Sequence, residues 1–260
     1  MTSLGGIIDL TVPIAERLPA AWPTHMPFQH KTFNWYEHSQ LGHEHRDDRL
    51  GPYATRWMAI DEHTGTHVDA PSHFIPPAGS GLPYANEWGD VNIDGIPLEQ
   101  LVGPAAVIDA PDDPADEGHS PLLEPEHVDA WELEHGRLEP GDIVLLRSSW
   151  DTRYRPGVEG DAYARDVVVH GRGAAWPAPS EATIDLLVER GVRCIGTDGP
   201  TMGPAQGGQG VHVAALGRGT VFIECLANLD RLPPRGATFV FLPINILHAT
   251  GAPGRAVAFV

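Results

Sequence analysis

The sequence has little positive charge and few cysteines. Its 260 residues include 17 lysines and arginines against 35 aspartates and glutamates, which gives a formal net charge of −18 with histidine neutral. Such a surface repels nucleic-acid phosphates and anionic lipid headgroups, so we expect neither nucleic-acid nor membrane-surface binding. The two cysteines, Cys194 and Cys225, each lie within an apolar run. This predicts buried thiols in a reducing cytoplasm.

The sequence also lacks the motifs of several common protein classes. No apolar run approaches the roughly 20 residues of a membrane-spanning helix, and Met1–Pro13 lacks the basic and apolar regions of a signal peptide. There is no GxSxG, no P-loop, no GxGxxG after a strand and no CxxC pair. These absences argue against nucleotide cofactors and against a serine or cysteine nucleophile. We therefore expect a cytoplasmic globular protein.

The composition favours one folded domain. Apolar residues make up 42% of the chain and charged residues 20%, which excludes a disordered chain. No linker or internal repeat divides the sequence, so we predict a single domain over residues 1–260. The 29 glycines and 25 prolines predict many turns and a modest helix content.

Short strands dominate the pattern, and only two helices are credible. One covers Glu124–His135, with a proline in its first turn. The other covers Ser180–Arg190, with Ser180 as N-cap and a glycine after its end. This pattern predicts a β-rich α/β domain but does not give the order of the sheet. The predicted strands are rich in Val, Ile or Phe and cover residues 7–14, 105–110, 142–147, 192–197, 220–226, 238–242 and 256–260.

The strongest chemical feature is the run HTGTHVDAPSH at residues 63–73. His63, His67 and Asp69 are spaced by even numbers of residues, so they share one face of an extended chain. Glycine, threonine and proline disfavour a helix here. We therefore predict a strand that runs into a turn at Pro71, with Gly65 leaving space between two imidazoles.

Two imidazoles and a carboxylate on one face form a ligand set for Zn, Mn, Fe or Ni. Three protein ligands leave coordination positions open for water, as catalysis requires. The alternative is a polar surface strand on which histidines occur by chance.

A second candidate group lies near residues 207–226. Glu224 is the only charge in an apolar stretch, and burial of a bare carboxylate costs several kcal/mol unless a cation or hydrogen-bond donors compensate. His212 follows a flexible glycine-rich segment and could reach the same site. Alternatively, Glu224 lies on an exposed edge strand and His212 in a loop. Trp22 is either a packing residue or an aromatic pocket wall, and these residues alone leave both questions open.

Residues 63–73 fit the pattern H-x-G-T-H-x-D-x-P-x-H, which resembles the cyclase/kynurenine formamidase family of metal-dependent hydrolases. That family includes isatin hydrolases. Weaker matches to the family's pattern occur elsewhere in the chain, in the order expected for that family. They are residues 9–14 with Trp22 and Pro23, residues 196–200, the His212 to Glu224 spacing and residues 251–257.

The resemblance implies a swivelling β/β/α fold and a centre with one or two divalent metals, Zn²⁺ or Mn²⁺. His63, His67 and Asp69 would hold the first metal, and Asp69 would bridge to a second. His212 and Glu224 would be ligands of the second metal. His73 would be the catalytic acid/base, and Trp22 would contact the substrate.

We therefore expect hydrolysis of an amide C–N bond by metal-activated water, in an arylformamide such as N-formylkynurenine. The alternative within the family is an isatin-type lactam or a lactone. A non-catalytic metal or ligand carrier is a third possibility, but it would not need His73. Like its relatives, the protein would act on a small molecule as a homodimer or homotetramer.

The chain is longer than a typical bacterial kynurenine formamidase. The excess falls in residues 28–56 and 150–178, where the walls of a pocket could differ. Residues 15–56 are predicted to be irregular, with an exposed polar excursion at His38–Arg49.

Overall fold

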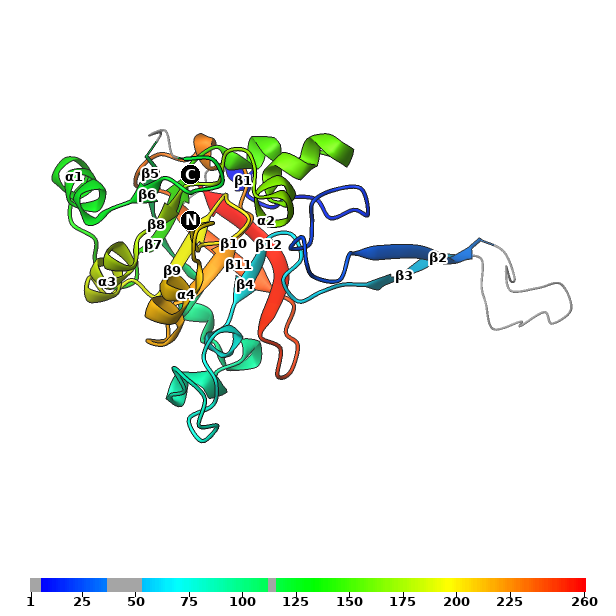
Figure 1. The fold of residues 1–260 in the computed structure, drawn as a ribbon, viewed down its shortest axis with the longest axis horizontal. Helices are drawn as coiled ribbons and strands as arrows, with labels where there is room; N and C mark the ends of the chain where they lie inside the picture. Colours follow the sequence, from blue (N-terminus) through cyan, green and yellow to red (C-terminus); the bar gives the residue numbers. More distant parts are fainter. Residues whose placement is uncertain (1–5, 37–52, 112–115) are drawn as a thin grey trace, which may run out of the picture.

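A closed ring of seven strands forms the body of the molecule. The computed structural model describes residues 6–36, 53–111 and 116–260 (Figure 1). Each strand of the ring pairs with the next, and the last pairs back with the first. The ring order is β12 (Gly251–Phe259), β11 (Thr238–Pro243), β5 (Val102–Asp109), β7 (Ile143–Arg147), β9 (Cys194–Thr197), β10 (Val221–Glu224) and β4 (His67–Asp69).

Strands β5, β7, β9 and β10 are parallel, and the other pairings in the ring are antiparallel. The parallel strands are buried on both faces, which explains their continuous apolar sequences. On β7, Ile143 and Leu145 belong to the core inside the ring, whereas Val144 and Leu146 pack beneath the helices. The prediction of a β-rich α/β domain is thus confirmed. The sequence did not predict that its sheet closes.

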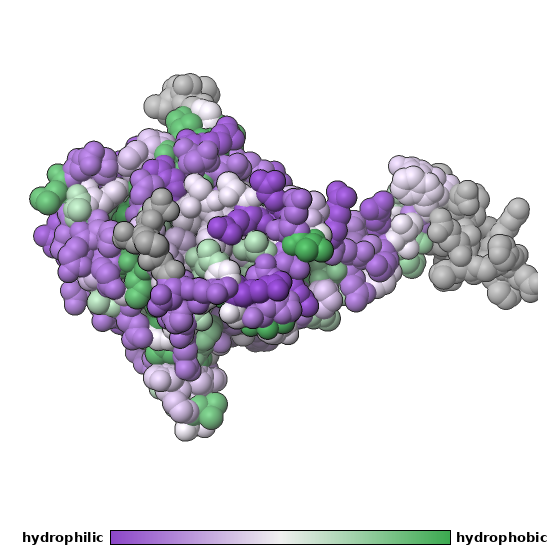
Figure 2. Space-filling model, turned by 45° about the horizontal axis from the view of Figure 1, so that its top comes forward, coloured by the Kyte–Doolittle hydropathy of each residue, from purple (hydrophilic) through white to green (hydrophobic). Residues whose placement is uncertain are grey.

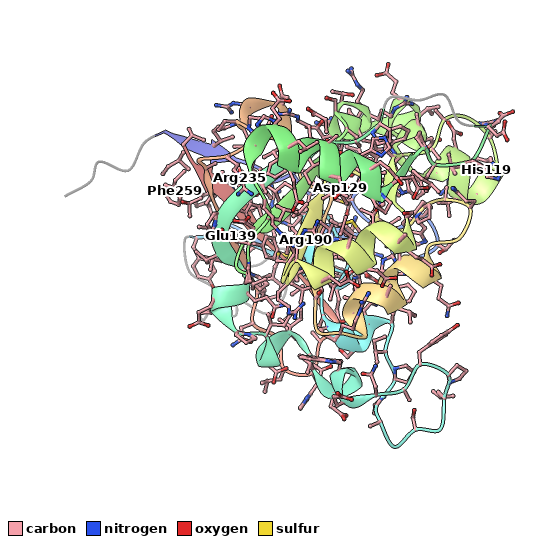
Figure 3. All side chains as sticks on the ribbon, turned by 90° about the vertical axis from the view of Figure 1, so that its left-hand side faces the viewer. His119, Asp129, Glu139, Arg190, Arg235 and Phe259 are labelled. Carbon is pink, nitrogen blue, oxygen red and sulfur yellow. The ribbon has the colours of Figure 1, made fainter. Side chains whose placement is uncertain are left out.

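Three helices cover the outside of the parallel strands: α1 (Pro125–His135), α3 (Glu181–Glu189) and α4 (Gln209–Leu216). The Ser180 side chain accepts the Thr183 N–H and caps α3, as predicted. The Arg190 guanidinium, at the end of α3, pairs with Glu132 of α1 and joins the two helices. It also lies 3.5 Å from the Asp129 carboxylate of α1, and Figure 3 labels Arg190 and Asp129. Within the described residues, no helix has the length and apolar character needed to cross a membrane.

The remaining elements are short. Strand β1 (Ile7–Asp9) extends the sheet beyond β12, β6 (Leu122–Leu123) pairs with β8 (Ala178–Pro179), and α2 (Arg165–His170) is a short helix. Short 3₁₀ segments cover Pro71–His73, Glu87–Asp90, Ile93–Gly95, Leu98–Gln100, Trp150–Arg153, Gly157–Tyr163 and Leu229–Arg231.

Some predicted boundaries were wrong. The first strand ends at Asp9 rather than at residue 14, because beyond it only an isolated bridge between Thr11 and Leu226 continues the pairing. Strand β12 begins already at Gly251, where it pairs with Asp69 of β4. Such long-range pairing leaves no trace in local sequence patterns.

The prediction that residues 15–56 are irregular holds for residues 15–28 but was wrong beyond them. Strands β2 (Gln29–Trp35) and β3 (Ala54–Ala59) form an antiparallel ribbon that projects from the body (Figure 1). The predicted excursion at His38–Arg49 lies outside the described residues. Figure 2 shows the ribbon as mostly purple to white with little green. It nevertheless carries several exposed aromatic and apolar side chains. They are Phe33, Trp35, Trp57 and Met58.

The run at residues 63–73 is only partly extended. Strand β4 covers His67–Asp69, whereas His63 lies in the preceding turn. Gly65 adopts a φ of +63°, and a Cβ atom there would lie 2.8 Å from Ile14 Cγ1. Glycine is therefore required by the turn and its packing, not by space between two imidazoles as predicted.

We expect Gly65→Ala to lower the free energy of unfolding by about 1–3 kcal/mol, because alanine is strained in the left-handed region and must displace Ile14. Urea denaturation measures this change. Gly79→Ala is the control, since a Cβ at Gly79 meets no atom within 4 Å and its φ is not left-handed. An equal effect of the two substitutions would contradict the packing argument.

Candidate metal centre

The pairing of β4 with β10 brings together residues that are far apart in the sequence. His67 lies directly opposite Glu224, and Asp69 follows two residues along β4 on the same face. Val68 and Ile223 point the other way, into the core of the ring. The predicted shared face of His67 and Asp69 is confirmed, and it is the outer face of the barrel.

His63 and His212 complete the group from two other elements. The turn before β4 places His63 Nδ1 at 2.8 Å from Asp69 Oδ1. Helix α4 places His212 Nε2 at 3.4 Å from Glu224 Oε1 and 3.9 Å from Asp69 Oδ2. The alternative that His212 lies in a loop was wrong, because residues 209–216 form a helix whose apolar side packs against β10.

The five residues form two overlapping groups that could each hold a metal ion. One is His63, His67 and Asp69, the other is Asp69, His212 and Glu224, and Asp69 belongs to both. Glu224 is only 4% exposed and β10 lies inside the sheet, between β9 and β4. The surface alternatives for Glu224 and for His63–His73 are therefore wrong.

Hydrogen bonds fix which nitrogen of two imidazoles faces this centre. His67 Nδ1 donates to the Gly65 carbonyl and His212 Nδ1 donates to the Gly208 carbonyl, both at 2.8 Å. In the neutral form of each ring, Nε2 then carries the lone pair, and in both residues this atom faces carboxylate oxygens. Lone pairs facing anionic oxygens repel unless a cation lies between them, so the donor set fits a divalent metal.

The electrostatics of the cluster also favour a bound positive charge. Burial alone would lower the pKa of His67, but Asp69 and Glu224 outweigh it and raise that pKa well above its usual value. Burial would raise the pKa of Asp69, yet the surrounding imidazoles hold it well below its usual value. Protons and metal ions compete for the same lone pairs, so a site that attracts one attracts the other.

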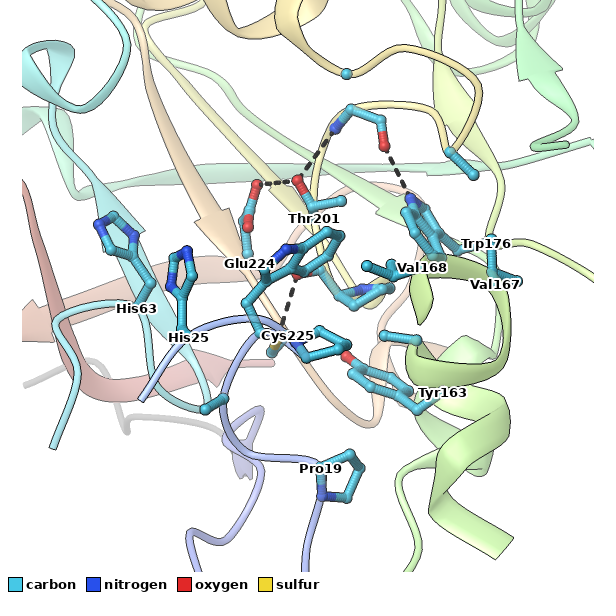
Figure 4. A pocket seen from close by; sticks show the side chains of 18 of the residues that line it. Pro19, His25, His63, Tyr163, Val167, Val168, Trp176, Thr201, Glu224 and Cys225 are labelled. Carbon is cyan, nitrogen blue, oxygen red and sulfur yellow. Dashed lines mark hydrogen bonds between the residues drawn. The ribbon is translucent and has the colours of Figure 1, made fainter. Parts of the chain in front are cut away.

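Glu224 is oriented by donors that the sequence analysis missed. The Thr201 hydroxyl and the Met202 N–H donate to Glu224 Oε1 at 3.1 and 2.6 Å, and Figure 4 shows the hydroxyl contact. Both donors directly follow residues 196–200, a stretch marked by the family resemblance. This position next to the matched stretch was the one feature of the sequence that could have pointed to them.

The cluster opens into a pocket with a volume of about 480 Å³ (Figure 4). Trp22 lines it and meets Trp176 edge to face, with ring centroids 6.0 Å apart. Two segments were predicted to contain the excess length of this chain and to shape the pocket. Residues 150–178 do supply part of the wall, whereas none of the described residues in 28–56 does. The analysis of the sequence missed several lining side chains, among them His25, Tyr163, Val167, Val168 and Trp176.

His73 ends the 3₁₀ turn after β4 and lines the same pocket. Its ring stacks on that of His63, with centroids 3.9 Å apart and planes at 30°. Burial lowers the pKa of His73 to about 4, helped by His63, His212 and His67 and opposed by Asp69. Among the described residues, none forms a hydrogen bond with its ring nitrogens, so these remain available to a molecule in the pocket.

Together, the fold and the site define a single-domain α/β protein with a closed mixed barrel and buried imidazole and carboxylate groups suited to a divalent metal. The chain belongs to the family described as "Putative cyclase", which matches residues 8–204. It is a cyclase-family hydrolase.

Named relatives support this assignment. The chain is 34% identical to the isatin hydrolase of Roseibium aggregatum over 220 residues, covering 82% of this chain and 78% of the relative. It is 30% identical to the kynurenine formamidase of Salinibacter ruber, covering 96% of both. The crystal structure of isatin hydrolase A from Labrenzia aggregata bound to benzyl benzoate superposes with a TM-score of 0.76 and 31% identity, covering 98% and 93% of the two chains.

We expect Asp69→Asn to weaken metal binding by more than about 100-fold, because Asp69 belongs to both ligand groups and even residues behind a ligand typically contribute 10–100-fold. Elemental analysis and chelator competition measure the loss. Asp90→Asn, which changes an exposed carboxylate, is the control. Unchanged metal content in the Asp69 variant would refute its role as a ligand.

Proposed function

We propose that the chain hydrolyses the lactam bond of an isatin-type cyclic aryl amide. The likeness to isatin hydrolases, in sequence and in fold together, is the observation that carries this proposal. It reverses the order expected from the sequence, in which an arylformamide such as N-formylkynurenine stood first. Both substrate types contain an amide C–N bond next to an aromatic ring, so the arylformamide is the second candidate.

The pocket has the size and lining that such a substrate needs. A cavity of about 480 Å³ accommodates a fused two-ring molecule. The aromatic side chains of Trp22, Phe74 and Trp176 line it and can stack on an aryl ring. The reacting carbonyl would then lie toward the imidazole and carboxylate cluster at the other side of the pocket.

His63, His67 and Asp69 would hold one divalent metal, and Asp69, His212 and Glu224 would hold a second. Zn²⁺ and Mn²⁺ both suit this donor set, and whether one or two ions bind stays a prediction. When bound, the metal would lower the pKa of a water molecule and polarise the substrate carbonyl.

His73 is the residue we assign to proton transfer. With its pKa lowered to about 4, the ring is neutral near pH 7 and can accept a proton from the attacking water. It can then return this proton to the nitrogen that leaves when the lactam ring opens. The stack on His63 holds the ring at the edge of the cluster, where the water would lie.

Other expectations remain predictions. We infer a swivelling β/β/α arrangement that spans residues 1–260, because a closed barrel packed against helices fits that description. The exposed apolar side chains of the β2–β3 ribbon are consistent with a homodimer or homotetramer, since an isolated two-stranded ribbon is marginally stable in water. A cytoplasmic location is also a proposal.

We expect isatin to be the preferred substrate in a panel with N-formylkynurenine, an anilide-type lactam and an aryl lactone. The measurement is kcat/KM for each compound, followed by ultraviolet absorbance. Complete chelation should abolish turnover, and Zn²⁺ or Mn²⁺ should restore it. Activity in a verified metal-free preparation would reject metal-assisted hydrolysis, and a preference for the formamide would restore the second candidate.

We expect His73→Ala to lower kcat by about 10²–10⁴-fold while metal content stays unchanged, since general acid–base catalysis typically contributes this much. Steady-state kinetics and elemental analysis of the same preparation test it. His119→Ala removes an exposed imidazole outside the pocket and should leave kcat unchanged. A fully active His73 variant would remove this residue from the mechanism.

A further inference from the structure

We propose that Glu62 and Thr250 form a hydrogen-bond relay that selects the tautomer of His63 and so keeps its Nδ1 free to bind metal. This inference rests on the metal-dependent function proposed above. Neither residue stood out in the sequence, and neither lines the pocket. Both would be positioning residues that act through His63.

The contacts run from the half-buried His63 ring to a carboxylate. His63 Nε2 lies 3.2 Å from Thr250 Oγ1, which in turn lies 2.9 Å from Glu62 Oε2. The same Glu62 oxygen accepts the backbone N–H groups of Thr250 at 2.8 Å and Gly251 at 3.3 Å. Three donors thus hold the carboxylate in place where β12 begins.

The direction of this chain follows from counting hydrogens. A carboxylate can only accept, so the single hydroxyl hydrogen of Thr250 must point at Glu62. The hydroxyl oxygen then accepts from His63, which places the ring proton on Nε2. The reverse order would leave two acceptors, Thr250 Oγ1 and Glu62 Oε2, facing each other at 2.9 Å without a hydrogen.

In the neutral ring, a proton on Nε2 leaves His63 Nδ1 bare toward the centre. That atom lies 2.8 Å from Asp69 Oδ1, a distance at which two acceptors repel each other. A cation that binds both atoms removes this repulsion. The relay therefore disfavours the tautomer that would satisfy Asp69 with a proton and favours the one that leaves a place for metal.

Packing keeps the His63 ring in this orientation. A Cβ atom on Gly251 would lie 2.4 Å from His63 Cε1, so only glycine lets the ring approach the β12 backbone so closely. The stack on His73 restrains the ring as well. With the ring plane restrained, the hydrogen bond at Nε2 decides which nitrogen carries the proton.

His63 differs in this respect from the other two imidazoles. Backbone carbonyls of Gly65 and Gly208 orient His67 and His212, and no substitution removes a backbone carbonyl. Among the three, only His63 has a side chain rather than a backbone carbonyl as the partner of the ring nitrogen that faces away from the centre. Its tautomer can therefore be changed by mutation without changing any proposed ligand.

The test compares Thr250→Val, which removes the hydroxyl at nearly constant shape, with Thr250→Ser, which keeps it. Zn²⁺ affinity is measured by chelator competition, and ¹⁵N spectra of the metal-free protein report the imidazole tautomers. We expect Thr250→Val to bind Zn²⁺ about 10–100-fold more weakly, the usual effect of losing a partner behind a ligand. Its His63 signals should shift toward a proton on Nδ1, and Thr250→Ser should behave as the unmodified protein.

Two further variants make the result specific. In Glu62→Ala, the Thr250 hydroxyl loses its acceptor and is free to donate to His63 Nε2, so Zn²⁺ affinity should fall and the tautomer should shift as in Thr250→Val. Thr152→Val removes a hydroxyl that bonds the Ser149 carbonyl outside the pocket, and it should leave both readouts unchanged. Urea denaturation of each metal-free variant establishes that the fold persists.

The proposal is overturned if Thr250→Val keeps normal affinity and tautomer, or if Thr250→Ser is as impaired as Thr250→Val. It is also overturned if Thr152→Val shows the same loss. All these measurements are made without substrate. Failure to hydrolyse isatin would reject the proposed substrate and leave the relay standing, whereas normal isatin turnover with an unaffected Thr250→Val would reject the relay alone.

Discussion

The pairing of the short strand β4 with both β10 and β12 is the constraint on which the rest of the structure depends. It closes the barrel, and in the same step it buries His67 and Asp69 beside Glu224. Burying two carboxylates would destabilise the fold severely without compensation. Hydrogen-bond donors and imidazoles supply part of that compensation, and the lone pairs left facing inward leave room for a cation.

Contacts behind the candidate ligands therefore hold these side chains in place. Backbone carbonyls orient two imidazoles, the Thr201 hydroxyl and a backbone N–H orient Glu224, and side chains orient His63. All of these groups come from rigid elements or from the turns that join them. Chemistry that needs ligands within a fraction of an ångström is more easily supported on strands and helix ends than on long loops.

The two faces of the closed sheet carry different kinds of side chain, and this explains how a stable core and a reactive site coexist. Apolar side chains fill the inside of the ring, and the outer face carries both the packed helices and the metal-ligand candidates. Alternation along β4 is what separates them, since Val68 enters the core while its two neighbours face the site. The pocket then adds aromatic walls from segments distant in sequence, which join the cluster to a surface suited to an aryl compound.

Local patterns in the sequence were enough to predict several elements and much of the chemistry. Apolar runs predicted the central strands, the Ser180 cap predicted α3, and the spacing of His67 and Asp69 predicted one face of a strand, because these patterns depend on neighbouring residues. Other features became clear only from the folded structure. The sheet closes, His212 lies on a helix, and β2 and β3 form a projecting ribbon. Glu62 and Thr250 also reach His63. Those features depend on strand register and on contacts between residues nearly 190 positions apart, and a chain read in order carries no local signal of which distant segments will pair.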